Sequence, residues 1–256
     1  MKYRGLGSWS WSERSLGKVQ YQEKFELARQ AVALQVDVVG SLAKRLIGIR
    51  KPSLTGDEVL SFRMPSTPTV RHVETLVEEV SSEALFRHSL RTYLWAKILA
   101  KQDGIVFDDE LLYVACLCHD LGLTQHQQRG RGGKACFSHL SAKAARKACK
   151  GHWPDERRDK LSEIITMHIN IHVPPIHGTE AHLLHEGANL DCTGIRFWEI
   201  AKSARTEVLR LQPRDGFKQE LRDIFRIECN QFPDGRTAFL HKFLLFGVLV
   251  KACPLK

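Results

Sequence analysis

The chain of 256 residues contains few segments in which apolar and polar side chains alternate as they do along a β-strand. It also lacks an internal repeat and a low-complexity tract, the patterns that mark solenoid and disordered classes. Apolar residues recur instead with the spacing of amphipathic helices. The sequence therefore predicts an all-α fold with short loops.

Long apolar segments are missing as well. The run at residues 243–250 is too short to span a bilayer, and Gln35 and Asp37 interrupt the apolar stretch near the N-terminus. The first residues, MKYRGLGSWSWSERS, are basic and rich in serine but lack the apolar core of a signal peptide, which leaves a transit peptide as an alternative. We expect a cytoplasmic protein with no membrane partner.

The cysteines form no paired framework. There are seven of them, an odd number, spread from Cys116 to Cys253. Cys116 and Cys118 are also too close together for a Cys-x-x-Cys zinc hook. Because a buried cysteine behaves as a small hydrophobic residue, we expect reduced thiols in a cytosolic protein.

A concentrated basic patch is also absent. The 38 basic and 29 acidic residues give a net charge of +9, which is compatible with nucleic acid or with anionic small molecules as partners. The basic residues are scattered, and we expect the densest cluster, Arg129, Arg131 and Lys134, to be a solvated loop. No nucleic-acid reader motif is present. We therefore expect a small-molecule substrate and no specific nucleic-acid partner, with a homo-oligomer left open.

Hydrophobic periodicity and breaker residues divide the chain into two parts. Residues 1–55 are expected to form an N-terminal extension, either a helical arm or partly disordered, and residues 56–256 the main domain. Pro65 and Pro68 mark a linker in RMPSTPTVRHVE. One or two helices are predicted over 21–49, and the others over 70–81, 83–102, 108–121, 138–150, 156–170, 179–191, 196–210, 217–229 and 237–252.

The segment CLCHDLGLT, residues 116–124, places a His-Asp pair at the end of an apolar helix. Asp108 is the predicted N-cap of this helix, and Gly122 is the predicted stop. His119 lies seven residues after Leu112 and so continues the inward-facing stripe. A buried carboxylate at Asp120 is costly unless a partner or a metal ion compensates it.

Three further polar residues occupy faces that should be apolar. They are His88 in RHSLRTYLWAKIL, His168 in LSEIITMHIN and Asp191 in EAHLLHEGANLD. Each residue alone has an ordinary explanation, as a hydrogen-bonded core histidine or a helix cap. Together with His119 and Asp120, they predict a site of imidazole and carboxylate ligands suited to divalent zinc, iron, manganese, cobalt or nickel.

Three segments, in this order, resemble the HD-domain superfamily and most nearly its cyanamide hydratase branch. They are FRHSLRTYLWA, DDELLYVACLCHDLGLT and LLHEGANLDCTG, and the similarity extends over roughly residues 62–245. The resemblance implies an HD-domain helical bundle, here with an added N-terminal helical segment. It also implies that His88, His119, Asp120 and Asp191 coordinate one divalent ion, with zinc preferred. His168 would then lie beside the substrate as the catalytic residue.

Two departures from that branch concern the wall of the pocket. CFSHLSAKA replaces the SFEFYGG typical of the branch, so that Phe137 matches but Ser138 stands at the glutamate position. HIN replaces HQD, which places Asn170 at the end of that motif. Phe137, Ser138 and Asn170 are the predicted substrate-binding residues. HD proteins with two metals place a histidine where this chain has Phe137, so one ion is favoured, although a small shift in register would bring His139 to that position.

These residues predict a metal-dependent enzyme that adds water to, or hydrolyses, a small nitrile- or cyanamide-like molecule. A bound divalent ion can lower the pKa of water to about 7, and His168 would carry a proton to the substrate nitrogen. One alternative is an HD phosphohydrolase in which Arg91, Arg129, Arg131 and Lys134 grip a phosphate. Another is a non-catalytic HD binding protein whose metal only links helices. A di-iron oxygen-activating site is a third, and it needs additional histidine ligands.

Overall fold

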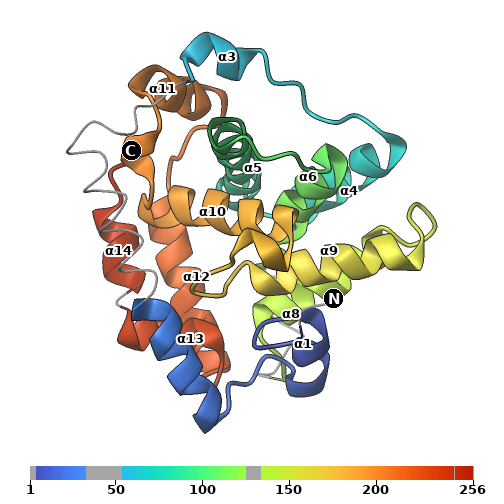
Figure 1. Cartoon of the computed structure of the whole chain (residues 1–256), viewed down its shortest axis with the longest axis vertical. Helices are drawn as coiled ribbons and strands as arrows, with labels where there is room; N and C mark the ends of the chain where they lie inside the picture. The colour runs from blue at the N-terminus through green and yellow to red at the C-terminus, as the bar shows by residue number, and fades with distance from the viewer. Residues whose placement is uncertain (1–3, 33–53, 125–133, 245, 256) are drawn as a thin grey trace.

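The computed structural model describes residues 4–32, 54–124, 134–244 and 246–255 (Figure 1). Over these residues the secondary structure is helical, and no strand forms. The prediction of an all-α helical bundle is confirmed. Within the same ranges, no helix combines the length and apolar character needed to cross a membrane.

Two long helices form the centre of the bundle. α5 (Glu83–Asp103) is buried along most of its length, and α10 (Thr179–Thr193) packs across it. Their backbones approach so closely that a Cβ atom on Gly187 of α10 would lie 2.4 Å from the carbonyl oxygen of Thr92. This contact holds the C-terminal part of α10 against the start of α5, where His88 lies.

Four helices pack around the central pair on one side. α4 (Pro68–Val80) starts with Pro68 after the N-cap Thr67, and α6 (Asp109–Cys118) starts after Asp108, whose side chain accepts from the amide of Leu111 as predicted. α8 (Phe137–Ala148) and α9 (Asp155–Met167) complete this side. Their apolar faces form the largest buried cluster, in which α6 is buried on all sides. α6 is therefore a fixed support for the residues that follow it.

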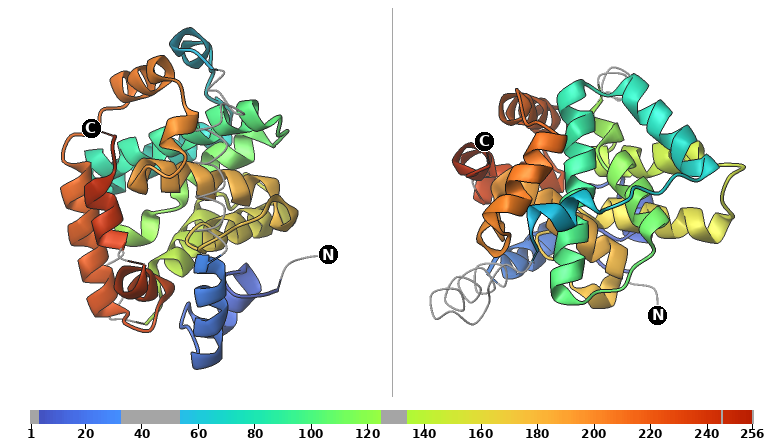
Figure 2. Two further views of the ribbon diagram at one scale, coloured as in Figure 1. Left: turned by 60° about the vertical axis from the view of Figure 1, so that its left-hand side comes forward. Right: turned by 90° about the horizontal axis from the view of Figure 1, so that it is seen from above.

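The C-terminal helices cover the other side of the pair (Figure 2). α11 (Lys202–Leu211) packs against α3 (Gly56–Leu60), while α12 (Phe217–Gln231), α13 (Arg236–Phe243) and α14 (Phe246–Ala252) contact one another. Two predicted ranges differ from the structure. The range 237–252 is two helices, and 196–210 begins as the 3₁₀ turn Phe197–Glu199 before α11.

The N-terminal segment packs on the bundle. α1 (Trp9–Ser15) contacts α8 and α9, and the amide of Trp9 donates to Glu163 Oε2 at 2.6 Å. A second helix covers residues 21–32, the described part of the predicted range 21–49. Its side chain Leu27 is buried in a small cluster with Trp11 and Ile171. The division of the chain near residue 55 stays a prediction.

The chain leaves α6 through a tight contact with α8. α6 ends at Cys118, and a 3₁₀ turn, Leu121–Leu123, follows it. Gly122 does not adopt the left-handed conformation of a helix stop, contrary to its predicted role. Glycine is required at this position because a Cβ atom there would lie only 2.1 Å from the carbonyl oxygen of Phe137. The amide of Gly122 also donates to Ser141 Oγ at 2.8 Å.

Candidate metal centre

The C-terminal end of α6 fixes the orientation of His119. This residue caps the helix with φ −61° and ψ −28°, and its Nδ1 lies 2.7 Å from the carbonyl oxygen of Cys116. Only a protonated Nδ1 can donate to a carbonyl, so Nε2 carries a lone pair. Burial lowers the pKa of His119, which keeps the ring neutral.

His88 faces His119 from α5. Its Nδ1 lies 2.7 Å from Asp191 Oδ2, so that this nitrogen donates to the carboxylate and, in the neutral ring, Nε2 carries the lone pair. The two Nε2 atoms lie 3.2 Å apart, and both rings are buried. Two lone pairs at this distance repel each other unless a proton or a cation lies between them.

Asp120 completes a triangle of possible ligand atoms. Its Oδ2 lies 3.3 Å from His119 Nε2 and 3.6 Å from His88 Nε2. Ligands about 2.1 Å from one ion are separated by about 3.0 to 3.4 Å in octahedral or tetrahedral geometry. Two edges of the triangle, 3.2 and 3.3 Å, match this range, and the third is slightly longer at 3.6 Å. Among the described residues, His88, His119 and Asp120 form the group of histidine, cysteine or acidic side chains whose ligand atoms lie close enough together to hold a metal ion. The residues therefore fit a divalent ion.

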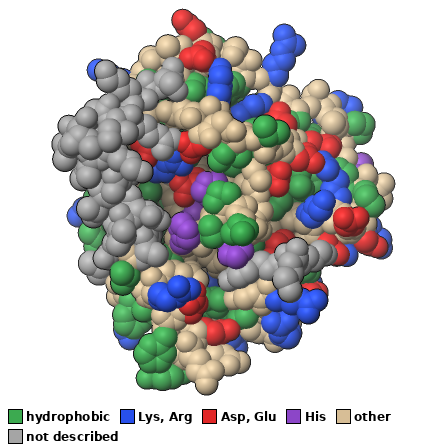
Figure 3. Space-filling model, in the orientation of Figure 1, with side chains coloured by type: hydrophobic (Ala, Val, Ile, Leu, Met, Phe, Trp, Pro, Cys, Tyr) green, Lys and Arg blue, Asp and Glu red, His purple; other side chains and the backbone are tan. Residues whose placement is uncertain are grey.

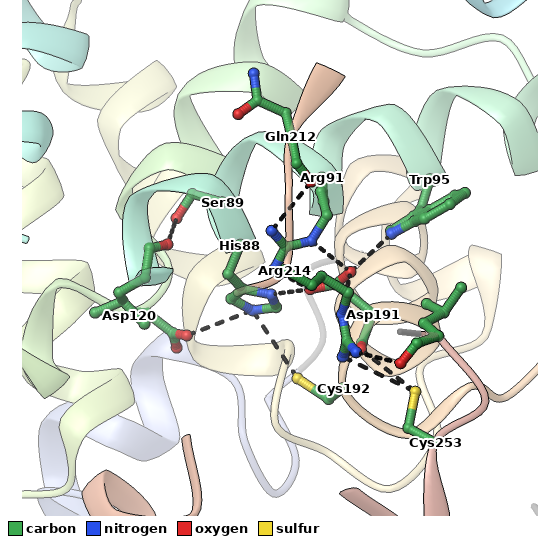
Figure 4. Close-up of polar contacts among 12 residues, drawn as sticks. His88, Ser89, Arg91, Trp95, Asp120, Asp191, Cys192, Gln212, Arg214 and Cys253 are labelled. Carbon is green, nitrogen blue, oxygen red and sulfur yellow. Dashed lines mark hydrogen bonds and ion pairs between the residues drawn. The ribbon is translucent and has the colours of Figure 1, made fainter. Parts of the chain in front are cut away.

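Asp191 lies on the far side of His88 from this triangle (Figure 4). Arg91 donates to both carboxylate oxygens at 2.9 Å, Trp95 Nε1 donates to Oδ1 at 2.9 Å, and His88 donates to Oδ2. Burial raises the pKa of Asp191, but Arg91, His88 and Arg214 together hold it well below its ordinary value. Four hydrogen bonds use about all the lone pairs of a carboxylate. In this arrangement Asp191 orients His88, and its role as a ligand stays a prediction.

His168 approaches the triangle from α9. It caps that helix, and its Nδ1 lies 2.5 Å from the carbonyl oxygen of Ile165, which leaves a lone pair on Nε2. Nε2 is 3.8 Å from Asp120 Oδ1, longer than a hydrogen bond, and the ring meets His119 edge to face with centroids 5.0 Å apart. Burial lowers the pKa of His168 well below its ordinary value. His168 is thus a neutral base beside the three ligand candidates.

A pocket opens directly in front of these four residues. It has an empty volume of about 760 Å³, part of it open to solvent, and its inner end is lined by His88, His119, Asp120 and His168. Histidine side chains are visible in a hollow on the face drawn in the space-filling view (Figure 3). The pocket gives a small molecule access to the point that the Nε2 atoms face.

The structure separates the three predicted substrate-binding residues. Asn170 lines the pocket, and its Oδ1 accepts from Arg236. Phe137 packs behind His168, with ring centroids 5.6 Å apart. Ser138 is fully buried outside the pocket lining, where its Oγ accepts from Arg236 Nη2 at 3.0 Å. Substrate contact by all three stays a prediction, and Asn170 has the most direct access.

Two site residues were not anticipated from the sequence. Arg236 is 1% exposed and connects Asn170 with Ser138, and nothing in its local pattern indicates a buried arginine. Cys192 lines the pocket with its Sγ 4.0 Å from His88 Nε2. Its position directly after Asp191 was the available indication, because consecutive residues at a helix end can face the same cavity.

The residues expected to grip a phosphate do not form a cluster in the described structure. The guanidinium of Arg91 is buried and bound to Asp191, and Lys134 is exposed. Arg129 and Arg131 lie outside the described residues. Arg91 is thus wrong as an anion ligand, because both of its donors toward the site already serve a carboxylate.

His139, the candidate ligand for a second ion, faces α1 instead. Its Nδ1 lies 3.0 Å from Ser12 Oγ, and its ring stacks on Trp9 with centroids 5.4 Å apart. A register in which His139 binds metal beside the cluster of His88, His119 and Asp120 is therefore not adopted, and the number of ions stays a prediction.

Comparison with known proteins agrees with this geometry. Residues 85–207 match the family model of the HD domain, and the match supports assignment of this region to the HD-domain superfamily. HD domains are typically metal-dependent hydrolases, and the cluster of His88, His119 and Asp120 fits such a site. No curated protein matches the chain significantly. The cyanamide hydratase branch therefore stays a resemblance in sequence.

Proposed function

We propose that this protein is a metal-dependent HD-family enzyme that adds water to a small nitrile- or cyanamide-like molecule. The observation that carries the proposal is the meeting of two imidazole lone pairs and one carboxylate oxygen at the inner end of a pocket, with a neutral His168 beside them. His88, His119 and Asp120 would hold one divalent ion, zinc before iron, manganese, cobalt or nickel. Such an ion supplies acidified water and polarises the substrate nitrogen.

The protein's own residues would position the reactants and move the proton. In hydration of a nitrile, the oxygen of water bonds to carbon and becomes the C=O oxygen, both C–N π bonds break, and both water protons end on nitrogen to give an amide. His168 Nε2 can accept a proton from the attacking water, since Nδ1 is committed to Ile165 and the ring is neutral. The same Nε2 can then return that proton to a substrate nitrogen held over it.

The alternatives receive less support. A phosphate ester needs cations around the anion, and within the described residues no lysine or arginine lines the pocket. A metal that only links helices needs no cavity, yet a pocket adjoins His168. The phosphohydrolase and the non-catalytic protein each predict a different result in a panel assay.

The test is a panel assay on zinc-loaded protein with cyanamide, acetonitrile, benzonitrile and p-nitrophenyl phosphate. We expect formation of urea or an amide that is lost on His119→Ala and on His168→Ala. Release of p-nitrophenol that depends on His119, without hydration of any nitrile, would overturn the proposal in favour of the phosphohydrolase. Activity toward none of these compounds, with metal still bound through His119, would favour the non-catalytic protein.

A further inference from the structure

The pocket has two chemically different parts. Its inner end holds three histidines and Asp120, which are the groups that act on a substrate in the proposed function. The rest of the wall comes from segments far apart in the sequence, chiefly α10 and the C-terminal helices α12, α13 and α14. This outer wall decides what kind of molecule can bring a reactive group to the inner end.

Most of the surface that lines the pocket is apolar. α10 contributes Ala188, and Ile195 follows it. The C-terminal helices contribute Phe225, Leu240, Phe246 and Leu249. A few amide and hydroxyl groups interrupt this wall, among them Asn189, Thr193 and Thr237. An apolar wall of this extent stabilises a ligand in proportion to the hydrocarbon surface that the ligand buries.

The charges near the pocket disfavour an anionic ligand. Asp120 is the charged side chain at the inner end, and in the described part of the chain neither a lysine nor an arginine joins the lining. Removing an ionised group from water without a counter-charge is strongly unfavourable. A free carboxylate or a phosphate far from the ion would therefore bind poorly against this wall.

We infer that the substrate is an uncharged molecule with two parts, a small polar head that reaches His88, His119 and His168, and a hydrocarbon body that packs on α10 and α12–α14. This inference rests on the proposed function and makes it more specific. Cyanamide has three heavy atoms and would leave most of the apolar wall from α10 to α14 without contact. A nitrile that carries an alkyl or aryl group would pack against that wall.

Binding of alkyl hydroxamates to the zinc-loaded full-length chain tests the inference without requiring turnover, because the hydroxamate head binds metal and the tail reports on the wall. The probes are acetohydroxamate, hexanohydroxamate and octanohydroxamate, measured by isothermal titration calorimetry. Each added CH₂ should strengthen binding about fourfold, which corresponds to about 0.8 kcal/mol per buried CH₂. A six-carbon probe that ends in a carboxylate should bind far more weakly than hexanohydroxamate.

Two neighbouring positions on α14 give a matched pair of variants. Leu249 lines the pocket and is 42% exposed, whereas Val248 is 58% exposed and lies outside the lining. Leu249→Asp should weaken hexanohydroxamate about tenfold while acetohydroxamate binds as before. Val248→Asp should change neither, and both positions are exposed enough for the fold to tolerate the charge.

The outcomes separate this inference from the function on which it rests. Equal affinity for short and long tails, with all probes lost on His119→Ala, would overturn the apolar substrate and leave the metal enzyme intact. Tightest binding of the carboxylate-ended probe would likewise overturn the apolar substrate alone. Failure of every hydroxamate to bind protein that holds zinc would overturn both proposals.

Discussion

The ends of α6 and α9 are built in the same way but serve the site differently. Each helix ends in a histidine cap, His119 and His168, with φ near −60° and ψ −28°. In each, Nδ1 donates to the carbonyl three residues earlier, Cys116 in one and Ile165 in the other. This local device fixes which nitrogen carries the lone pair and the direction in which it points.

The neighbours of the two rings account for the difference. His119 Nε2 lies 3.2 Å from His88 Nε2 and 3.3 Å from Asp120 Oδ2, whereas His168 Nε2 approaches Asp120 Oδ1 no closer than 3.8 Å. His119 therefore has the surroundings of a metal ligand, and His168 has those of a base. The comparison teaches that a helix cap orients an imidazole, while the packing of other helices around it gives the imidazole its role.

Alanine substitution at each cap gives the largest expected difference. His119→Ala should lower metal affinity by more than about 100-fold, since loss of groups that merely orient ligands already costs about 10- to 100-fold. His168→Ala should retain the metal and lower kcat by about 10²- to 10⁴-fold, the range of general acid–base catalysis. Competition with a chromophoric chelator measures the first quantity, and turnover of the best nitrile measures the second. Equal loss of metal in both variants would make His168 a ligand.

His88, the third histidine of the site, is oriented by the side chain of Asp191, whereas His119 and His168 are oriented by backbone carbonyls. Asp191→Asn removes the negative charge between Arg91 and Arg214 and weakens the bond that orients His88. We expect a loss of about 3–5 kcal/mol in the free energy of unfolding, because the change leaves buried cations uncompensated. Urea denaturation measures this loss.

Asp223→Asn is the control for that variant. Asp223 pairs with Arg226 on the surface, where such a pair contributes about 0–1 kcal/mol. Asp191→Asn should also weaken metal binding by about 10- to 100-fold through His88. A stability loss no larger than that of the control would show that Asp191 does not balance the two arginines.

Substitution of His139, a buried histidine that is neither a ligand candidate nor a base at the site, should give the smallest change, and that change is in the pH dependence of stability. Burial lowers the pKa of His139 to about 4, and the nearby Lys143 acts in the same direction. Between the folded value and the ordinary 6.5, the unfolded chain binds more protons, so the folded state is stabilised fully above pH 6.5 and loses that stability as the pH falls toward 4. Wild type should therefore lose about 2 kcal/mol more than His139→Gln between pH 7 and pH 5.

Denaturant unfolding at the two pH values checks this difference. The exposed His152→Gln is the control for substitution of a histidine as such. If wild type and His139→Gln lose stability equally on acidification, then His139 is not held neutral by its contacts with Ser12 and Trp9.

Much of the fold followed from local chemistry. The N-cap at Asp108 and most helix bounds agree with expectation because caps, breakers and periodicity act within a few residues. Pro68, predicted to lie in the linker, is instead the first residue of α4, where a proline is tolerated because its missing N–H has no partner in the helix. The break between α13 and α14 and the short α1 were not predicted. Both involve helices of at most eight residues, which are stabilised by the neighbours they pack against more than by their own sequence.

The same division between local effects and tertiary packing applies to the candidate site. The sequence by itself determined that His119, Asp120 and His168 occupy inward-facing helix ends, because hydrophobic periodicity dictates which face of a helix is buried. Only the tertiary structure decided that Asp191 meets Arg91 and Trp95 as well as His88, since those side chains come from another helix. It also decided that an apolar wall from the last helices faces the histidines, because spacing along a chain carries no information about which distant surfaces share a cavity.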